Sequence, residues 1–252
     1  MSRTALACLR IGARDVVALC GAGGKTTLLY RLAAEARAAG LRVLATTTTH
    51  MGTLPAAVTG PVFVEEDGDP GPALGEALRR HGQATLLGRR IRADKIEGVP
   101  PERVDVLSGQ ADLVLVEADG ARGRSLKVPA SHEPVVPAST TLLLVVAALD
   151  ALGQRLDAER VHRLELVVAA TGRSIGDVID EDMVAAALLH PAGYLSRRPP
   201  ASRSGVFLNK AEDAPTRAAA ARIAGRLRPP YDLVAAGSAR GADIFSFPDL
   251  IS

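Results

Sequence analysis

The residues with the clearest chemical potential form one short run, Gly21-Ala22-Gly23-Gly24-Lys25-Thr26-Thr27. Glycines let the backbone N–H groups of a loop turn inward onto phosphate oxygens. A helix that starts at such a loop directs the positive end of its dipole at the same oxygens. The ammonium of Lys25 can then reach the outer phosphates of a nucleoside triphosphate, and the hydroxyl of Thr26 can ligate Mg²⁺. The run predicts a phosphate loop that binds ATP or GTP together with Mg²⁺.

The spacing inside this run departs from the commonest phosphate-loop pattern, because Leu19 stands six residues before Lys25, where that pattern has glycine. The loop looks more like the shorter Gly-x-x-Gly-Lys-Thr-Thr loop of Mur-type ligases. It also resembles the loop of the nitrogenase-iron-protein and metal-insertion GTPase class, in which a lysine stands at the place of Cys20. The alternative is an ordinary glycine-rich turn between a strand and a helix.

Two carboxylates, Glu117 and Asp119, stand at the end of an apolar run that begins after Asp112. A carboxylate at a strand end beside a phosphate loop typically binds Mg²⁺ through water or orients an attacking water. Asp119 is the first choice for the metal site and Glu117 the second. The alternative is that both carboxylates only cap a turn.

Cations and hydroxyls follow the ends of two predicted strands. A basic loop interleaved with small residues comes after Asp119, and four threonines and a histidine occupy residues 46–50. Such groups suit an anionic ligand. Alternatively, the basic loop is merely solvated and the threonines end a strand, a structure that threonine favours. We predict that an anionic small-molecule second substrate contacts Thr48, His50, Arg122, Lys127 and His132.

A third group of polar residues could read a nucleotide base. Asn209 and Lys210 begin a segment that resembles the Asn-Lys-x-Asp motif of GTPases, although Glu212 takes the place of the aspartate. Ser238 lies in a segment similar to the Ser-Ala loop whose backbone N–H meets guanine O6. Together the two segments favour guanine over adenine, so we expect GTP to bind at least as well as ATP. Two ordinary loops are the alternative.

The elements that must position these residues alternate between strands and helices. Apolar runs predict strands at residues 15–20, 41–46, 62–64, 84–87, 112–117, 141–147, 205–209 and 231–236. Helical periodicity predicts helices at residues 26–39, 73–81, 101–107, 158–171, 180–189 and 215–227. This alternation predicts an α/β fold, a P-loop NTPase-like three-layer arrangement with a mostly parallel sheet. We expect one domain over residues 1–252, with a strandless helical insertion, a subdomain or lid, at residues 150–200.

Composition narrows the classes of function. The chain has 252 residues, of which 47% are hydrophobic, and a net charge of +2, so the balance of charge does not indicate a nucleic-acid partner. No apolar run reaches the roughly 18 residues of a membrane span, and the first ten residues have no signal pattern. Two cysteines without metal or redox spacing fit a reducing cytoplasm. We therefore expect a cytoplasmic protein without a membrane partner.

The ordered set of motifs resembles the YqeC-like selenium-dependent hydroxylase accessory family, also described as a selenium cofactor biosynthesis family. The resemblance covers roughly residues 18–240, and its most specific part is the stretch at residues 117–134. The motifs that carry it are Cys20 to Thr26, Thr46 to Met51, Glu117 to Lys127, His132 to Pro134, His162-Arg163 and Leu208 to Lys210. The resemblance implies a role in maturing a molybdenum hydroxylase, or its selenium-bearing cofactor, with that hydroxylase as a partner.

These residues support one leading function and two alternatives. The leading one is a Mg²⁺-dependent NTPase or phosphotransferase in which Lys25, Asp119 and Arg124 are catalytic. The first alternative is a nucleotide-gated chaperone or carrier for a molybdenum hydroxylase, which would turn over only with that partner. The second is a Mur-like ATP-dependent ligase, for which the chain is short.

Overall fold

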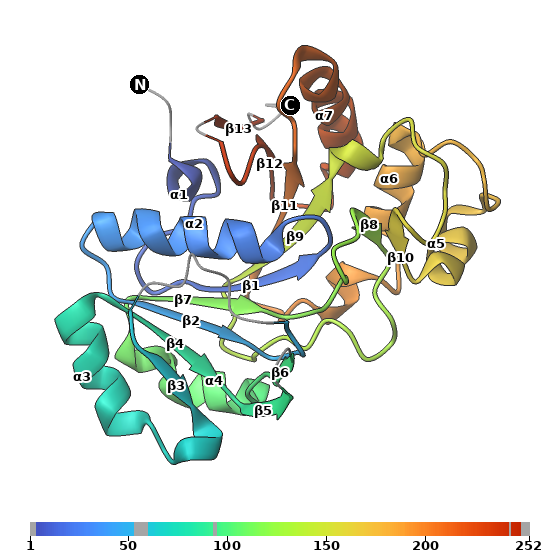
Figure 1. Cartoon of the computed structure of the whole chain (residues 1–252). Coiled ribbons are helices and arrows are strands. Elements are labelled where there is room, and N and C mark those ends of the chain that lie inside the picture. The colour runs from blue at the N-terminus through green and yellow to red at the C-terminus, as the bar shows by residue number, and fades with distance from the viewer. Residues whose placement is uncertain (1–3, 53–59, 93–94, 242, 248–252) are drawn as a thin grey trace.

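The protein is built around one large sheet, which the computed structural model places at its centre (Figure 1). The structure describes residues 4–52, 60–92, 95–241 and 243–247. The first ten residues were expected to have no signal pattern, and the first three of them lie outside the described residues. From edge to edge the nine strands are β13 (Ile244–Ser246), β12 (Leu233–Gly237), β11 (Arg203–Asn209), β9 (Leu142–Ala148), β1 (Val16–Gly21), β7 (Leu113–Glu117), β2 (Val43–Thr47), β4 (Gln83–Leu87) and β3 (Val62–Val64).

The prediction of a mostly parallel sheet is confirmed. Every pair of neighbouring strands is parallel except β12 and β13. The central strands β1, β7 and β9 are buried along their whole length, which explains why they read as continuous apolar runs. The register sets Leu19 opposite Glu117 and Gly21 opposite Val146, so the glycine loop emerges between β7 and β9.

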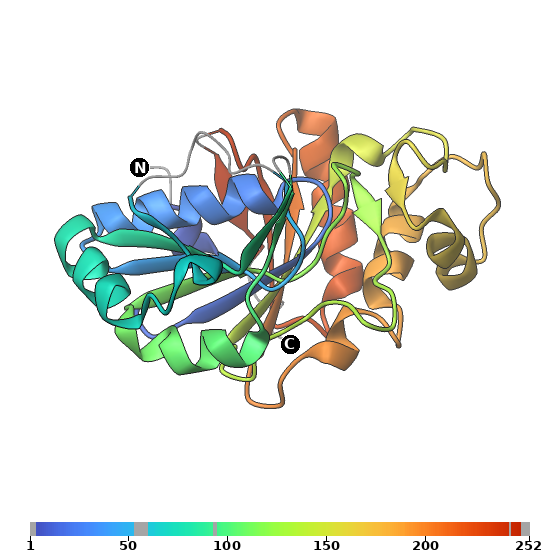
Figure 2. The same ribbon diagram turned by 60° about the horizontal axis from the view of Figure 1, so that its bottom comes forward.

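Helices cover both faces of the sheet. Val17 and Leu19 pack in one apolar cluster with α1 and α2, whereas Ala18 and Cys20 belong to a cluster with α6 and α7 on the opposite face. Figures 1 and 2 show α2 (blue) and α4 (green) on opposite sides of the strands. The helices are α1 (Ala5–Cys8), α2 (Lys25–Ala38), α3 (Gly71–His81), α4 (Pro101–Leu107), α5 (Leu164–Thr171), α6 (Glu181–Leu189) and α7 (Ala214–Leu227). The chain therefore adopts a three-layer α/β fold of the P-loop NTPase-like kind.

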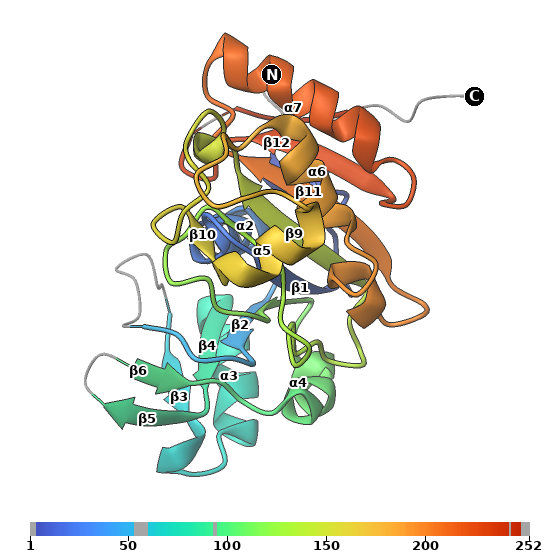
Figure 3. The same ribbon diagram turned by 90° about the vertical axis from the view of Figure 1, so that its right-hand side faces the viewer.

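Residues 149–202, between β9 and β11, differ from the expected helical insertion. Helix α5 begins only at Leu164, because Val161 and His162 form a short strand, β10 (Val161–His162), beside β8 (Leu126–Lys127). The expectation of a strandless segment was therefore wrong. Figure 3 views the molecule from the side that carries α5 and α6, and α6 packs against α7 of the main body. Movement of this segment as a lid remains a prediction.

Short elements that the sequence did not predict complete the fold. Strands β5 (Arg89–Arg92) and β6 (Lys95–Glu97) form an antiparallel pair, and β13 closes one sheet edge. Within the described residues, none of the helices combines the length and the apolar character needed to cross a bilayer.

The core makes a testable contribution to stability. Phe207 of β11 is fully buried among aliphatic side chains of β9 and β12, so Phe207→Ala should lower the free energy of unfolding by about 3–5 kcal/mol. Val106, which is 71% exposed on α4, provides the control, and Val106→Ala should change that free energy by less than about 0.5 kcal/mol. Urea denaturation of both variants checks the contrast, and equal losses would contradict the assignment of the core.

Candidate functional site

The phosphate loop, defined as residues Gly21 to Thr27, connects β1 to α2 and needs glycine at positions that include Gly21 and Gly24. Gly21 has a φ of 95°, and a Cβ there would lie 2.1 Å from the carbonyl oxygen of Val146. Gly24 has a φ of 124°, and a Cβ there would lie 2.2 Å from Nδ2 of Asn209. Gly24 is also the N-cap of α2 and supplies no side chain to its first N–H groups. These N–H groups remain available to a phosphate.

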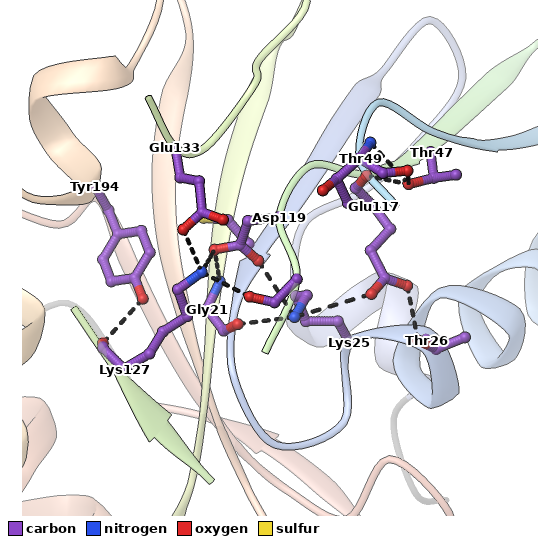
Figure 4. Close-up of polar contacts among 12 residues, drawn as sticks. Gly21, Lys25, Thr26, Thr47, Thr49, Glu117, Asp119, Lys127, Glu133 and Tyr194 are labelled. Atoms are coloured by element: carbon purple, nitrogen blue, oxygen red, sulfur yellow. Dashed lines mark hydrogen bonds and ion pairs between the residues drawn. The ribbon is translucent and has the colours of Figure 1, made fainter. Parts of the chain in front are cut away.

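Lys25, the first residue of α2, is held inside the loop rather than in solvent. Its ammonium donates to the carbonyl oxygen of Gly21 at 2.8 Å and lies 3.2 Å from Oδ1 of Asp119 and 3.9 Å from Oε1 of Glu117 (Figure 4). Burial opposes the charge, but the two carboxylates outweigh it and raise the pKa of Lys25 above its ordinary value. Lys25 is therefore held as a cation inside the loop.

Asp119 lies behind the loop and has no exposed surface. Its Oδ2 accepts from the backbone N–H of Gly21 at 3.0 Å and lies 3.0 Å from the ammonium of Lys127, while Oδ1 faces Lys25. The sequence ranked Asp119 first for Mg²⁺. The structure places Asp119 beside Lys25 but surrounds both of its carboxylate oxygens with these groups. Two ammonium ions therefore compete with a metal for this carboxylate.

Glu117, the second choice for the metal, occupies the more suitable position. Its Oε2 accepts from the Thr26 hydroxyl at 2.7 Å, and the residue lines the cavity described below. Burial raises the pKa of Glu117 above its ordinary value, and this effect exceeds the opposing influence of Lys25. Among the described residues, no three His, Cys, Asp or Glu side chains gather into a metal-binding group. Thr26 and Glu117 thus form a two-residue arrangement with hard oxygen donors, which Mg²⁺ prefers.

A cavity of about 1010 Å³ opens beside the phosphate loop. Its walls are the loop itself, the segment after β2, the basic loop after β7, and the segment around β10. The lining includes five cationic side chains against three carboxylates, so an anionic ligand is electrostatically favoured there. The cations are Lys25, Lys95, Arg122, Arg124 and Arg163.

The predicted second-substrate residues separate in the structure. His50 and Arg122 line the cavity, as does Arg124, which was predicted to be catalytic. Thr48 instead donates to the carbonyl oxygen of Val135 at 2.6 Å. Lys127 has a fully buried side chain whose ammonium contacts Asp119, Glu133 at 2.8 Å and the carbonyl oxygen of Gly120 at 2.7 Å. The structure therefore places Lys127 in the protein interior rather than on the ligand, because its donors already have acceptors.

His132, the remaining predicted contact, is exposed, and its Nε2 lies 3.5 Å from a guanidinium nitrogen of Arg163. Arg163 and its neighbour His162 were not among the site residues predicted by the sequence. They reach the cavity only because β10 pairs with β8, which aligns His162 with Lys127. Two residues of strand give too short a pattern to detect, so the only signal in the sequence was the His162-Arg163 motif of the family resemblance.

The residues predicted to read a base lie on the other side of the loop, at the ends of β11 and β12. Nδ2 of Asn209 donates to the carbonyl oxygen of Gly23 at 2.6 Å, and its Oδ1 accepts from the N–H of Ala239 at 2.8 Å. Lys210 pairs with Asp150 at 2.5 Å, and the Ser238 hydroxyl donates to Glu212 at 2.7 Å. The pairing of Asn209 with Gly237 brings these two segments together, and the hydrogen bond from Asn209 to Gly23 joins them to the phosphate loop.

The cavity-lining residues and the predicted base-reading residues lie beside the point where the order of strands in the sheet switches direction, next to β1. From β1 the chain crosses one face through α2 to β2, whereas the strands on the other side of β1 are β9 and β11, with α6 and α7 on the opposite face. The carboxyl ends of parallel strands at such a point form the usual ligand crevice of open α/β sheets. The site therefore lies where this fold normally binds ligands.

Comparisons with known proteins point to one family. The model of the YqeC family, described as YqeC protein, matches residues 17–165. The YqeC protein of Escherichia coli (strain K12) is 34% identical over 197 residues, which are 77% of this chain and 75% of that protein.

The solved structures that match this chain are more distant. Chloroplast FtsY from Physcomitrella patens matches with 18% identity and a TM-score of 0.43, over 93% of this chain and 62% of that chain. FtsY from Thermotoga maritima also matches with 18% identity and a TM-score of 0.43, over 93% of this chain and 65% of that chain. The chain thus spans less than two thirds of the FtsY chains it matches.

The buried carboxylate between two lysines generates a stability prediction. Asp119→Asn removes the negative charge that Lys25 and Lys127 share and leaves these two buried ammonium groups with only Glu117 and Glu133 as carboxylate partners, so it should lower the free energy of unfolding by about 3–5 kcal/mol. Asp112→Asn is the control, because Asp112 pairs with Arg42 at the surface and should lose less than about 1 kcal/mol. Chemical denaturation of the two variants measures the difference. A loss for Asp119→Asn no greater than that of the control would refute the buried role.

Proposed function

The chain belongs to the YqeC family, and we propose that it is a Mg²⁺-dependent nucleoside triphosphatase or phosphotransferase whose second substrate is a small anion. One observation carries the proposal: the phosphate loop and the arginines of the basic loop line the same cavity. A phosphoryl group held at the loop would face cations that can stabilise it or hold its acceptor. The second set of cations therefore suits either an anionic phosphoryl acceptor or stabilisation of the charge that develops during hydrolysis.

The residues around the loop fit a nucleoside triphosphate with Mg²⁺. In this proposal Lys25 and the N–H groups at the start of α2 hold the outer phosphates, and Thr26 and Glu117 hold the metal. When bound, Mg²⁺ neutralises charge that develops on the transferring phosphoryl group. Asp119 acts as a positioning residue that keeps Lys25 charged and aligned, and Arg124 contacts the anionic acceptor or the transferring group.

Base recognition remains a proposal for Asn209, Lys210 and Ser238. Their support is that Asn209 donates to the carbonyl oxygen of Gly23 and that its partner in the sheet, Gly237, directly precedes Ser238. A purine whose phosphates lie on Gly23 and Gly24 would extend toward these strand ends. We propose that guanine is read there and that GTP binds at least as well as ATP.

The cellular role that we propose is maturation of a selenium-dependent molybdenum hydroxylase or its cofactor, in keeping with the family resemblance. The cationic second half of the cavity favours a small-molecule substrate over a purely nucleotide-gated carrier. Phosphate release by the isolated chain would support the enzyme, whereas release only with a hydroxylase present would support the carrier.

Nucleotide binding is tested first at Lys25. Lys25→Ala should weaken binding of ATP or GTP on the order of 100-fold, because the phosphates lose a charge-assisted contact. Isothermal titration calorimetry with Mg²⁺ gives the affinity. Arg37→Ala, on the exposed last turn of α2, should bind as the wild type does. Because Lys25 also pairs with Asp119, circular dichroism must first establish that the variant is folded. Wild-type affinity in folded Lys25→Ala would end the phosphate-loop hypothesis.

The role of Arg124 calls for a separation of binding from turnover. Arg124→Ala should slow phosphate release by tenfold or more while changing nucleotide affinity by less than about threefold, as expected for a group acting in the transition state. Arg124→Lys should restore only part of the rate, because a point charge cannot replace a planar fork. Exposed Arg80 on α3 supplies the control substitution Arg80→Ala. Wild-type rates for both Arg124 variants would show that the basic loop is merely solvated.

A further inference from the structure

Arg163 is positioned over the cavity by an unusual backbone conformation. It follows β10 and is the N-cap of α5, with a φ of 59°. Arg122, on the basic loop that lines the same cavity, also has a positive φ, of 49°. The left-handed region is costly for a residue with a side chain, and such strain concentrates at ligand sites. Two arginines of one cavity share this feature.

The guanidinium of Arg163 has donors to spare. One nitrogen donates to Oε1 of Glu133 at 3.1 Å, while Oε2 of the same carboxylate accepts from Lys127 at 2.8 Å. Nε of Arg163 is buried, and among the described residues it has no hydrogen-bond partner. Buried donors are normally satisfied, so an orphan donor beside a cavity points to a ligand that completes it.

The surroundings of Arg163 carry an excess of positive charge. Its single carboxylate contact, Glu133, is already shared with Lys127. The side chains of Arg122 and Arg124, which line the same cavity, form no ion pair or hydrogen bond with any residue that the structure describes. By contrast, Arg42, Arg103 and Arg222 on the surface each pair with a carboxylate. A dianionic group would neutralise this end of the cavity better than a single carboxylate could.

We propose that Arg163, together with Arg122 and His162, forms a subsite for a phosphate group carried by the second substrate. The substrate class is thus a phosphorylated small molecule, bound by its phosphate at the β10 end of the cavity while its other end faces the phosphate loop. This inference rests on the proposed function, which makes this cavity the site of the second substrate. Arg163 determines specificity in it, and Glu133 holds the guanidinium in place when the subsite is empty.

His162 provides a local reporter for this subsite. Burial, followed by the charges of Lys127 and Arg163, lowers the pKa of His162 below its ordinary value. A dianion bound beside the imidazole would favour its protonated form and raise that pKa. A merely structural arginine cluster would give no such response to added phosphate.

The experiment is an NMR titration of the histidine resonances, with His162→Gln identifying the reporter signal. Inorganic phosphate is the probe, and the protein is saturated with Mg²⁺ and a nucleoside diphosphate so that the phosphate loop is occupied. Phosphate should raise the pKa of His162 saturably. Arg163→Gln should raise the phosphate concentration at the titration midpoint at least tenfold, and Arg163→Lys should reverse part of that rise. Arg173→Gln, which breaks a surface pair with Asp180 outside the cavity, should keep the wild-type midpoint.

Several outcomes would overturn the proposal. A His162 signal that phosphate leaves unchanged would exclude the subsite, as would equal midpoints for the wild type and Arg163→Gln. An equal response to acetate would exclude the preference for a phosphate dianion. Nucleotide titrations distinguish this failure from failure of the proposed function. If nucleotide binding still depends on Lys25, only the subsite proposal fails. If no nucleotide binds, the proposed function fails, and the same phosphate titration on Lys25→Ala still decides the subsite.

Discussion

A single buried carboxylate, Asp119, sets the geometry on which the rest of the site depends. An ionised carboxylate without solvent contact is stable only when cations and N–H groups surround it. Asp119 meets this requirement with Lys25 on one oxygen and Lys127 and the N–H of Gly21 on the other. Because these partners come from the loop after β1 and from β8, one side chain fixes the phosphate loop against the base of the basic loop.

The same charges continue beyond Asp119. Lys127 forms ion pairs with both Asp119 and Glu133, and Glu133 forms a further ion pair with Arg163 at the start of α5. Tyr194 supports this line by donating from its hydroxyl to the carbonyl oxygen of Lys127 at 3.0 Å. Cations and anions thus alternate from the phosphate loop to the far end of the cavity. A ligand that draws Arg163 away from Glu133 would alter the balance at Lys127, so the two ends of the cavity are electrostatically connected.

The two acidic residues Glu117 and Asp119 have different roles because their side chains lie in different surroundings. Glu117 is the last residue of the strand and reaches Thr26 at the cavity wall, whereas Asp119 turns into the interior. Neighbouring carboxylates can therefore serve different purposes, one toward a metal and one toward a lysine. The same division separates the cations, since Lys127 is internal and Arg122 and Arg124 face the cavity.

Much of the fold could be read from the sequence because it depends on local patterns. Parallel strands buried on both faces must be apolar along their length, so the runs that became β1, β7, β9 and β11 were visible, as was the glycine-rich turn into α2. The strands β8 and β10 were not visible. Each has only two residues and exists through pairing with the other, across more than thirty residues of chain.

For the site, the sequence by itself determined the chemical groups and their order: the loop lysine and threonine, the acidic strand end, the basic loop and the Asn-Lys segment. Only the tertiary structure decided which of these groups meet the cavity. Glu117 and Asp119 are two residues apart and chemically alike, and nothing local says which one is enclosed by lysines. Arg163 and Glu133 likewise become partners only when β10 lies beside β8. Burial and charge pairing depend on residues distant in the chain, and these set the role of each ionisable group.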